Sequence, residues 1–409
     1  MPRLLFVSPS NSYRIASFIN ACKRLDVDVF LLTEGQHSLA TQWAGGLQVE
    51  SFNDSDKILS LLAAETFDAV LASDDKTVSL AAVLATAMGL SSNNPLAARL
   101  SQRKDLARAA LSQYNLPVPE HWLIDLSHSS SEGLSSLRYP CVLKPLSLSG
   151  SQGVIRVNTV DEARSACLRI TRLIANLPGE ESHFVLAERY IPGVEVAVEG
   201  LLTEGNLELL ACFDKPDPLE GPFFEETLYV TPSRLPEVIQ QNIAQTVSDV
   251  CSAYGLRHGP VHAELRIDDK DQVWVLEVAM RTIGGLCAQI FEWISGATLE
   301  EAVIQNSLKR PLVCRETGHP AGGVMMIPVP KAGVLRRVEG IRQAQAVRYI
   351  TEVTISVRDG YRLIPLPEGN QYLGFIFAAA ETPACVEQAL REAHACLTIV
   401  VAPLWDIQQ

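Results

Sequence analysis

The chain has 409 residues, of which 47% are hydrophobic, and its formal net charge is −13 at pH 7. This length predicts two to four domains, or one large α/β unit with additions, and the negative charge argues against nucleic acid or an anionic membrane as the main partner. The nine cysteines are scattered and never occur in CxxC spacing, which favours reduced thiols in the cytoplasm over a disulfide framework or a zinc site. The apolar stretches, such as residues 78–90, are too short to cross a membrane.

The first ninety residues have the pattern of a parallel sheet. Residues 4–7, 27–32 and 67–72 are apolar and strand-like, and residues 14–24 and 77–88 have helical spacing. Strands that alternate with helices predict a parallel sheet, and the N-terminal MPRLLFVSPS is expected to be its first strand rather than a signal peptide. No GxGxxG follows this strand, so the dinucleotide-binding fingerprint is absent.

Two acidic residues, Asp74 and Asp75, follow the third predicted strand. Open α/β sheets bind ligands at the carboxyl ends of their strands, so these side chains are placed for a ligand. The alternative is that one of them caps the following helix. We expect a cap from one of the two and leave the other open.

A linker at residues 89–95 precedes residues 96–114, which we predict to form one basic helix containing Lys104. Residues 139–157, YPCVLKPLSLSGSQGVIRV, have the pattern strand, glycine-containing loop, strand. Because Lys144 precedes the loop, this is not a Walker A motif. A Ser/Gly loop of this kind can cover a triphosphate with its backbone N–H groups, and the alternative is an ordinary turn.

Residues 184–199 predict two further strands, with Glu188 and Glu195 on either side of the turn at residues 191–193. A helix is expected over residues 236–254. It leads into VHAELRI and QVWVLEVA, two segments rich in β-branched and aromatic residues that predict a hairpin.

The hairpin carries two glutamates that we expect to face each other. If it turns at Lys270-Asp271, facing residue numbers sum to 541, as those of Glu264 and Glu277 do. Their Cβ atoms would then lie roughly 5 Å apart, which is destabilising unless positive charge lies between them. Arg266 and Arg281 are possible counter-charges, but Mg²⁺ suits the pair better because it takes one or two carboxylates and completes its shell with phosphates.

The region after residue 318 has its own pattern. Three strand-like segments, GGVMMIPVP, RYITEVTISV and LGFIFAAA, precede a predicted amphipathic helix at residues 383–397. This pattern favours a small α+β domain that closes over the middle of the chain.

Four segments, in order, resemble the ATP-grasp superfamily of carboxylate–amine ligases, and within it the bacilysin-type L-amino acid ligases. They are ARLSQRKDLARAAL, YPCVLKP with its SGSQG loop, LAERYIPGVEV, and HAELRI followed by VLEVAMRTIGG. The resemblance spans most of the chain and implies an ATP-grasp fold of mixed α/β and α+β class. It implies an N-terminal parallel-sheet domain at 1–95, an ATP-grasp region at 96–315 with a mobile central subdomain at about 140–212, and a small C-terminal α+β domain at 316–409.

The resemblance also implies how ATP is held. Lys104 and Lys144 would contact the phosphates, Glu188 and the backbone near Ile191 the adenine, and Glu195 the ribose hydroxyls. The loop covering the phosphates would consist of Ser149, Gly150, Ser151 and Gly153.

The metal and the acid would meet on the hairpin. The resemblance implies that Glu264 and Glu277 hold Mg²⁺, with Mn²⁺ as an alternative, and that Arg281 faces the carboxylate being activated. His262 would line the acceptor pocket. Where many ATP-grasp enzymes have a metal-binding Asn, this chain has Ala279, which leaves open whether one or two metals bind.

Some of these residues also have purely structural interpretations: Lys104 as an exposed helix lysine, His262 as a satisfied core histidine, and Arg281 as a neutralising charge. The reaction implied is activation of a small carboxylate by ATP, followed by attack of an amine. The alternatives are a nucleotide-pathway ligase, a bicarbonate-using carboxylase, or a non-catalytic ATP sensor. The acid, the amine and the oligomeric state stay open, with a homodimer as one option.

Overall fold

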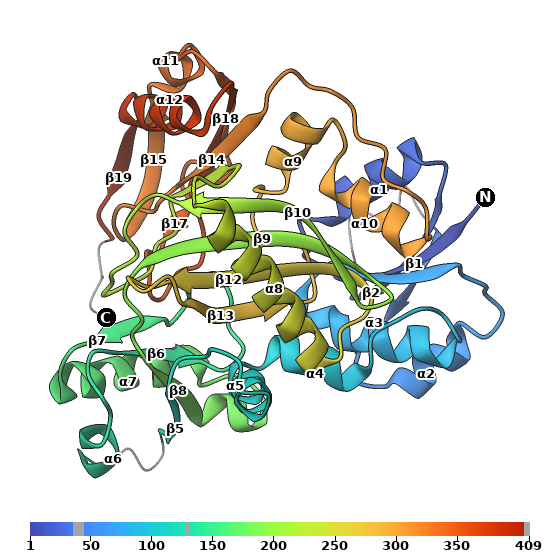
Figure 1. Cartoon of the computed structure of the whole chain (residues 1–409), viewed down its shortest axis with the longest axis horizontal. Coiled ribbons are helices and arrows are strands. Elements are labelled where there is room, and N and C mark those ends of the chain that lie inside the picture. The colour runs from blue at the N-terminus through green and yellow to red at the C-terminus, as the bar shows by residue number, and fades with distance from the viewer. Residues whose placement is uncertain (36–44, 127–130, 405–409) are drawn as a thin grey trace.

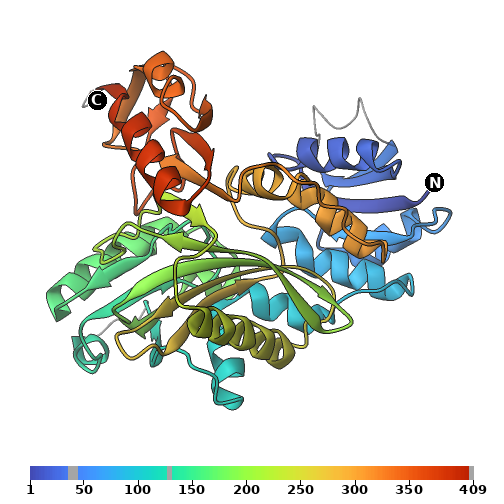
Figure 2. The same cartoon turned by 45° about the horizontal axis from the view of Figure 1, so that its top comes forward.

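The computed structural model describes residues 1–35, 45–126 and 131–404, whose strands form four sheets (Figure 1). Two lobes, one from each end of the chain, rise on the same side of a large central sheet (Figure 2). Within the described residues no helix combines the length and the apolarity needed to cross a membrane.

The N-terminal sheet is parallel throughout, as the alternation of strands and helices predicted. Its order is β3-β2-β1-β4. The strands are β1 (Arg3–Pro9), β2 (Asp28–Glu34), β3 (Gly45–Val49) and β4 (Ala69–Ala72), and the helices are α1 (Ile15–Arg24), α2 (Ser55–Leu61) and α3 (Asp75–Ala87). The prediction missed β3, whose first four residues are exposed or half-buried and so give no apolar signal.

The single helix predicted over residues 96–114 is wrong. The chain forms α4 (Pro95–Gln102) and α5 (Lys104–Gln113), separated by Arg103 in an extended conformation (φ −115°, ψ 106°). The N–H of Lys104 donates 3.0 Å to the carbonyl of Leu146 instead of continuing the helix. The break therefore ties the start of α5 to the loop that follows Lys144.

A second, antiparallel sheet forms a smaller lobe, with strand order β5-β8-β6-β7 (Figure 1). Its strands are β5 (His121–Asp125), β6 (Cys141–Pro145), β7 (Ile155–Val157) and β8 (Phe184–Arg189); its helices are α6 (Ser131–Ser135), α7 (Val160–Ile174) and the 3₁₀ helix η1 (Gly179–Ser182). The predicted strand, loop, strand pattern at residues 139–157 is confirmed by β6 and β7.

The largest sheet has eight strands in the order β13-β12-β9-β10-β11-β14-β18-β16. These are β9 (Val194–Thr203), β10 (Asn206–Lys215), β11 (Leu228–Thr231), β12 (Gly259–Ile267), β13 (Val273–Ala279), β14 (Ala321–Ile327), β16 (Ile350–Ile355) and β18 (Gly374–Ala380). The helix α8 (Glu237–Tyr254) packs its apolar side on strands β9, β12 and β13. Two more helices, α9 (Gln289–Ser295) and α10 (Leu299–Ser307), share a core with α1.

Glu264 and Glu277 are paired across β12 and β13, as predicted, but a β-bulge next to them sets this register. Pairs from His262 to Glu264 sum to 541, whereas Leu265 pairs with Val275 and the remaining pairs sum to 540. The extra residue, Leu276, lies next to Glu277. It leaves one backbone carbonyl at the bulge free for another partner.

The C-terminal residues contribute strands to the central sheet as well as a lobe of their own. A three-stranded sheet, β17-β15-β19, is built from β15 (Gly333–Glu339), β17 (Arg362–Leu363) and β19 (Thr398–Ala402), with helices α11 (Ile341–Gln345) and α12 (Pro383–Ala395). Because β14, β16 and β18 belong to the eight-stranded sheet, that sheet continues across residue 315. We keep the domain division at residues 95 and 315 as a proposal.

Candidate functional site

A cavity of about 120 Å³ lies between the second sheet and the central sheet. It is lined by all the predicted site residues except Gly153. They come from the start of α5, the β6–β7 loop, and strands β6, β8, β9, β12 and β13. Segments up to 177 residues apart in sequence, from Lys104 to Arg281, therefore converge on one cavity, which we call the first cavity.

Gly153 lies outside the lining but still requires glycine. Its φ is +74°, and a β-carbon there would lie 2.6 Å from Cγ of Pro145 and 2.9 Å from Cδ2 of Leu173. The residue thus lets the loop pack closely over the end of β6. Its predicted place in the nucleotide-contacting loop stays a prediction.

In the lining of the first cavity, Glu188 is enclosed by two cations. Arg108 Nε donates 2.7 Å to one carboxylate oxygen, and Lys144 Nζ lies 2.5 Å from the other. Burial alone would raise the pKa of Glu188, but the two cations lower it to about 2. Burial also lowers the pKa of Lys144 below its usual value, although Glu188 opposes this. Arg108 also donates 2.5 Å to the carbonyl of Leu276, the bulge residue of the hairpin.

Glu195 is the second fully paired carboxylate. Lys215 Nζ lies 2.7 Å from one of its oxygens, and Arg266 Nε donates 2.9 Å to the other. Arg266 also donates 2.7 Å to the carbonyl of Ile191. The proposal that Arg266 neutralises the Glu264–Glu277 pair is therefore wrong, because its guanidinium is committed to Glu195 and to backbone carbonyls.

Glu264 and Glu277 are only loosely paired. Lys215 lies 3.5 Å from Glu264 and Lys104 lies 3.4 Å from Glu277, while 25% and 30% of the two glutamate side chains are exposed. Opposed carboxylates with oxygens free toward a cavity are the ligand set that Mg²⁺ favours. The residues present thus fit a divalent metal.

Another set of three carboxylates, Glu195, Glu226 and Glu264, has oxygens within 4.8 Å of one another. The ammonium of Lys215 contacts all three of them. Burial alone would lower the pKa of Lys215, but these glutamates hold it well above its usual value. This set already contains a cation, whereas Glu277 lies outside it, so Glu264 and Glu277 stay our predicted metal ligands.

The two predicted catalytic residues lie among charges, with His262 buried and Arg281 half-buried. His262 contacts Glu199 through Nδ1, and its Nε2 lies 3.5 Å from Glu264. Burial alone would lower the pKa of His262, but these carboxylates raise it to about 9. The histidine lies directly across from Ala279, the position where an Asn was expected from the family pattern. Its contacts agree with both the structural and the functional interpretation.

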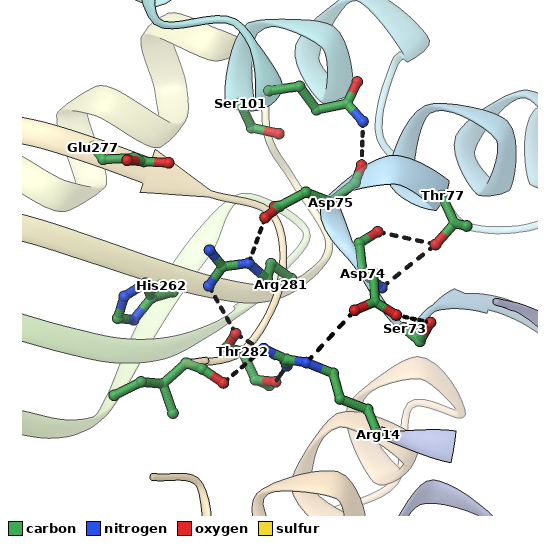
Figure 3. Close-up of polar contacts among 12 residues, drawn as sticks. Arg14, Ser73, Asp74, Asp75, Thr77, Ser101, His262, Glu277, Arg281 and Thr282 are labelled. Carbon is green, nitrogen blue, oxygen red and sulfur yellow. Dashed lines mark hydrogen bonds and ion pairs between the residues drawn. The ribbon is translucent and has the colours of Figure 1, made fainter. Parts of the chain in front are cut away.

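Arg281 lies between the N-terminal sheet and the hairpin (Figure 3). Its Nε donates 2.9 Å to Asp75, and its Nη1 donates 3.0 Å to the carbonyl of Thr282. Burial would lower the pKa of Arg281, but Asp75 holds it above its usual value. Asp74 is the N-cap residue of α3 and accordingly takes the capping role left open between the two aspartates, whereas Asp75 pairs with Arg281.

A second cavity of about 720 Å³ opens beside Arg281. Arg14 borders it and holds the turn after Arg281, donating 2.7 Å to Oγ1 of Thr282 and 2.9 Å to the carbonyl of Ile283 (Figure 3). Both cavities are lined by Ser149, Gly150, Glu226, His262, Glu264 and Arg281. Glu264 and Arg281 thus lie where the two cavities meet.

Sequence reasoning missed four charged residues of the site: Arg14, Arg108, Lys215 and Glu226. Lys215 is paired with Glu195 across strands β9 and β10, so the strand register would have found it. Arg14 and Arg108 bind partners that are 268 and 80 residues away in sequence, and no local sequence pattern predicts such contacts.

Comparison with known proteins agrees with this geometry. A model of the ATP-grasp domain matches residues 137–290, and a model of the L-amino acid ligase C-terminal domain 2 matches residues 325–402. Residues 137–290 thus form an ATP-grasp domain, and the chain has the ATP-grasp fold. ATP-grasp proteins use ATP, and Mg²⁺ is their typical metal.

This ATP-grasp chain superposes on the crystal structure of an L-amino acid ligase from Bacillus licheniformis with a TM-score of 0.80, at 24% identity, covering 98% of this chain and 99% of that one. Carnosine synthase 1 from Gallus gallus is 26% identical over 320 residues, 72% of this chain and 34% of that protein. Alanine–anticapsin ligase from Bacillus subtilis is 22% identical over 310 residues, 69% of this chain and 63% of that protein. The matched regions are less than two thirds of the length of these two relatives.

Proposed function

We propose that this protein is an ATP-dependent ligase that joins a small carboxylate, of the amino acid class, to an amine. The carboxylate oxygen attacks the γ-phosphorus of ATP and displaces ADP, giving an acyl phosphate. The amine nitrogen then attacks the acyl carbon, the carbon–oxygen bond to phosphate breaks, and the amine loses a proton. The products are an amide, ADP and phosphate.

The observation that carries this proposal is the meeting of the two cavities. The first is lined by Lys104 and Lys144, which suit a triphosphate, and the second opens beside Arg281. A guanidinium binds a planar carboxylate in a bidentate manner. Glu264 and Arg281 line both cavities, so an acid held at Arg281 would lie next to the phosphate end of the nucleotide.

Glu264 and Glu277 would hold Mg²⁺, or Mn²⁺ in its place, which would neutralise charge on the phosphates. The chain's own residues have the other tasks. Lys104 and Lys144 bind the phosphates, and Glu188, Ile191 and Glu195 bind the nucleoside. The loop with Ser149, Gly150, Ser151 and Gly153 covers the phosphates and excludes water, which would hydrolyse the acyl phosphate.

The second cavity supports an amino acid substrate. In its lining, Arg14 and Arg281 provide positive charge, and Asp74 and Asp75 provide negative charge. Among the described residues, Nε of Arg14 is buried without a hydrogen-bond partner. The lining also includes the apolar side chains of Ile283, Leu286, Cys287, Met326 and Phe375. A zwitterion with an apolar side chain matches this combination of charged and apolar groups.

The test is to incubate the protein with MgATP and pooled amino acids, and to measure ADP by enzymatic assay and condensation products by mass spectrometry. Amide products that appear only with ATP would support the proposal. ADP formed only with bicarbonate, or only with a ribonucleotide amine, would favour another ATP-grasp reaction. ATP binding without phosphate release from any acid and amine pair would favour a sensor.

Two further proposals concern the setting. All nine cysteines are free thiols, and five of them are buried, which supports a reducing compartment such as the cytoplasm. A homodimer stays a prediction, and sedimentation of the purified protein would decide it.

A further inference from the structure

The loop between β6 and β7 is held by a C-terminal segment, residues 365–372, which we call the clamp segment. The N–H of Gly153 donates 2.8 Å to the carbonyl of Pro367, and Gln152 Nε2 donates 2.8 Å to the carbonyl of Glu368. A β-carbon added to Gly150 would lie 3.5 Å from Cβ of Asn370. Three points of the loop therefore rest on one segment that is more than 200 residues away in sequence.

An ion pair joins the clamp segment to the helix behind the loop. Arg169, on α7, donates through Nε and Nη2 to the two carboxylate oxygens of Glu368, each at 2.8 Å. The hydrogen bond to Arg169 lowers the pKa of Glu368. This is the bidentate geometry in which an arginine fixes orientation as well as distance. The pair thus sets how far the lobe carrying α7 lies from the C-terminal strands.

The loop needs external support for its conformation. Gly150, Ser151 and Gly153 all have positive φ, at 63°, 55° and 74°. A non-glycine residue such as Ser151 persists in this region only when its surroundings impose it. The clamp segment provides that constraint through hydrogen bonds to the next two residues, Gln152 and Gly153.

The clamp segment also borders the second cavity through Asn370, Gln371 and Tyr372. Ser149 and Gly150 line both cavities. The clamp segment consequently contacts the β6–β7 loop and also lines the second cavity, where we propose that the acid and the amine bind.

We propose that Arg169 and Glu368 are positioning residues that hold the β6–β7 loop over the phosphates, so that acyl phosphate is passed to the amine rather than to water. This inference rests on the proposed ligase function. With 41% and 44% of the two side chains exposed, the pair contributes little to the stability of the fold. Its bidentate geometry and its place beside the loop instead suit it to set the loop's position.

The experiment uses Arg169→Glu, Glu368→Arg and the double variant that exchanges the two charges, with Glu368→Gln as a milder change. The measurements are ADP formed per amide and the KM for ATP. Each single variant should raise the ratio of ADP to amide at least about threefold, because an open loop admits water. The exchanged pair should return it to within about twofold of the parent, since the coupling energy is restored.

Arg164→Glu is the matched control, because Arg164 lies on the same helix and pairs with the exposed Asp161 rather than with the clamp segment. It should leave both measurements unchanged. Single variants with the parent's ratio and KM, or an exchanged pair no better than the single variants, would overturn the proposal. Melting temperatures of all variants identify any loss of fold.

Failure of the ligase function is distinguishable from failure of this inference. If the parent makes no amide, the loop is tested by hydrogen exchange at residues 149–153 with a non-hydrolysable ATP analogue. Faster exchange in Glu368→Gln and Arg169→Glu, but not in Arg164→Glu, would support the positioning role without any turnover. Equal exchange in all four proteins would overturn it.

Discussion

Two pairs of glutamates that line the first cavity differ in how completely their charges are paired. Both oxygens of Glu188 and both of Glu195 have cationic partners within 2.9 Å. Glu264 and Glu277 have cations only at 3.4 to 3.5 Å. We call Glu188 and Glu195 with their cations the paired end and Glu264 and Glu277 the open end; the names describe the pairing, because oxygens of Glu195 and Glu264 lie within 4.8 Å of each other.

The difference separates carboxylates whose oxygens are already held by protein cations from carboxylates whose oxygens are open to a metal ion. A buried charge with complete partners is expensive to disturb, because removal of one partner strands the others. Such a network fixes the positions of Lys144 and of the Ile191 carbonyl. For loosely paired carboxylates, little interaction energy is lost when a metal cation replaces their distant lysine partners. Residue type alone does not divide the site in this way, since all four residues are glutamates.

The largest expected effect is on stability, at the paired end. Glu188→Gln would leave Arg108 and Lys144 buried without their shared anion, and we expect the free energy of unfolding to fall by about 3 kcal/mol. Urea denaturation measures this. The control is Glu120→Gln, in which the exposed partner of Arg138 is replaced and little change is expected. Equal stability of the two variants would remove the distinction between the ends.

At the open end, Glu277→Gln should leave the fold intact and lower turnover at least about 100-fold, or roughly 2.7 kcal/mol in the barrier. The reason is the loss of one carboxylate ligand from the proposed metal pair. Steady-state ADP release at several Mg²⁺ concentrations measures the effect. Asp269→Asn, at the tip of the same hairpin, is the control. Near-normal turnover in Glu277→Gln would contradict the metal assignment.

The opposed glutamates could be predicted because paired residues in an antiparallel hairpin have numbers with a constant sum. The assumed sum of 541 holds for the pairs from His262–Ala279 to Glu264–Glu277. It fails for the pairs between the bulge and the hairpin turn, which sum to 540. The bulge at Leu276 has no sequence signal, and it matters because its carbonyl accepts from Arg108. The sequence thus predicted the opposed glutamates but not the contact that ties their hairpin to the paired end.

The other features of the site could not be predicted from local patterns, because each depends on contacts between segments that are distant in sequence. The helix break at Arg103 depends on a hydrogen bond from Lys104 to Leu146, which periodicity within residues 96–114 cannot contain. Asp74 and Asp75 were equivalent in sequence, and only the start of α3 and the position of Arg281 separate them. Ion pairs between distant elements set the paired end, whereas motifs within single elements had indicated the open end.

A third prediction tests Arg281 as a residue of the open end. Arg281→Lys should keep ATP affinity within about twofold and lower turnover about 30-fold, or roughly 2 kcal/mol, because a lysine ammonium cannot bind a carboxylate through two parallel hydrogen bonds. Nucleotide titration and turnover are measured on the same preparation. Loss of ATP affinity instead would place Arg281 in the nucleotide site, and our role for it would be wrong.

Lys144 sharpens the comparison because it belongs to the paired end and is also one of the two proposed phosphate-binding lysines of the first cavity. Lys144→Ala should raise the dissociation constant for ATP at least about tenfold, or roughly 1.4 kcal/mol. Arg108 still pairs with Glu188 in this variant, so the fold should persist. Calorimetric titration with an ATP analogue provides the measurement, and Lys76→Ala is the control. An unchanged dissociation constant would restrict Lys144 to a structural role.

The smallest expected effect is the pH dependence of the paired end. Glu188 titrates near 4.5 when unfolded and near 2 in the folded protein. A depressed folded pKa contributes stability above the unfolded pKa, and that contribution is lost as pH falls from about 4.5 toward 2. The difference in unfolding free energy between the parent and Glu188→Gln should therefore shrink by roughly 0.7 kcal/mol between pH 5 and pH 4.

Only this difference isolates Glu188, because other carboxylates titrate in the same range in both proteins and cancel. Urea denaturation of both proteins at pH 6, 5 and 4 provides it, with a constant difference expected between pH 6 and pH 5 to within about 0.2 kcal/mol. A difference that stays constant down to pH 4 would show that Glu188 binds its proton equally well in both states. Its pairing with Arg108 and Lys144 would then not persist in solution, and the paired end would resemble the open one.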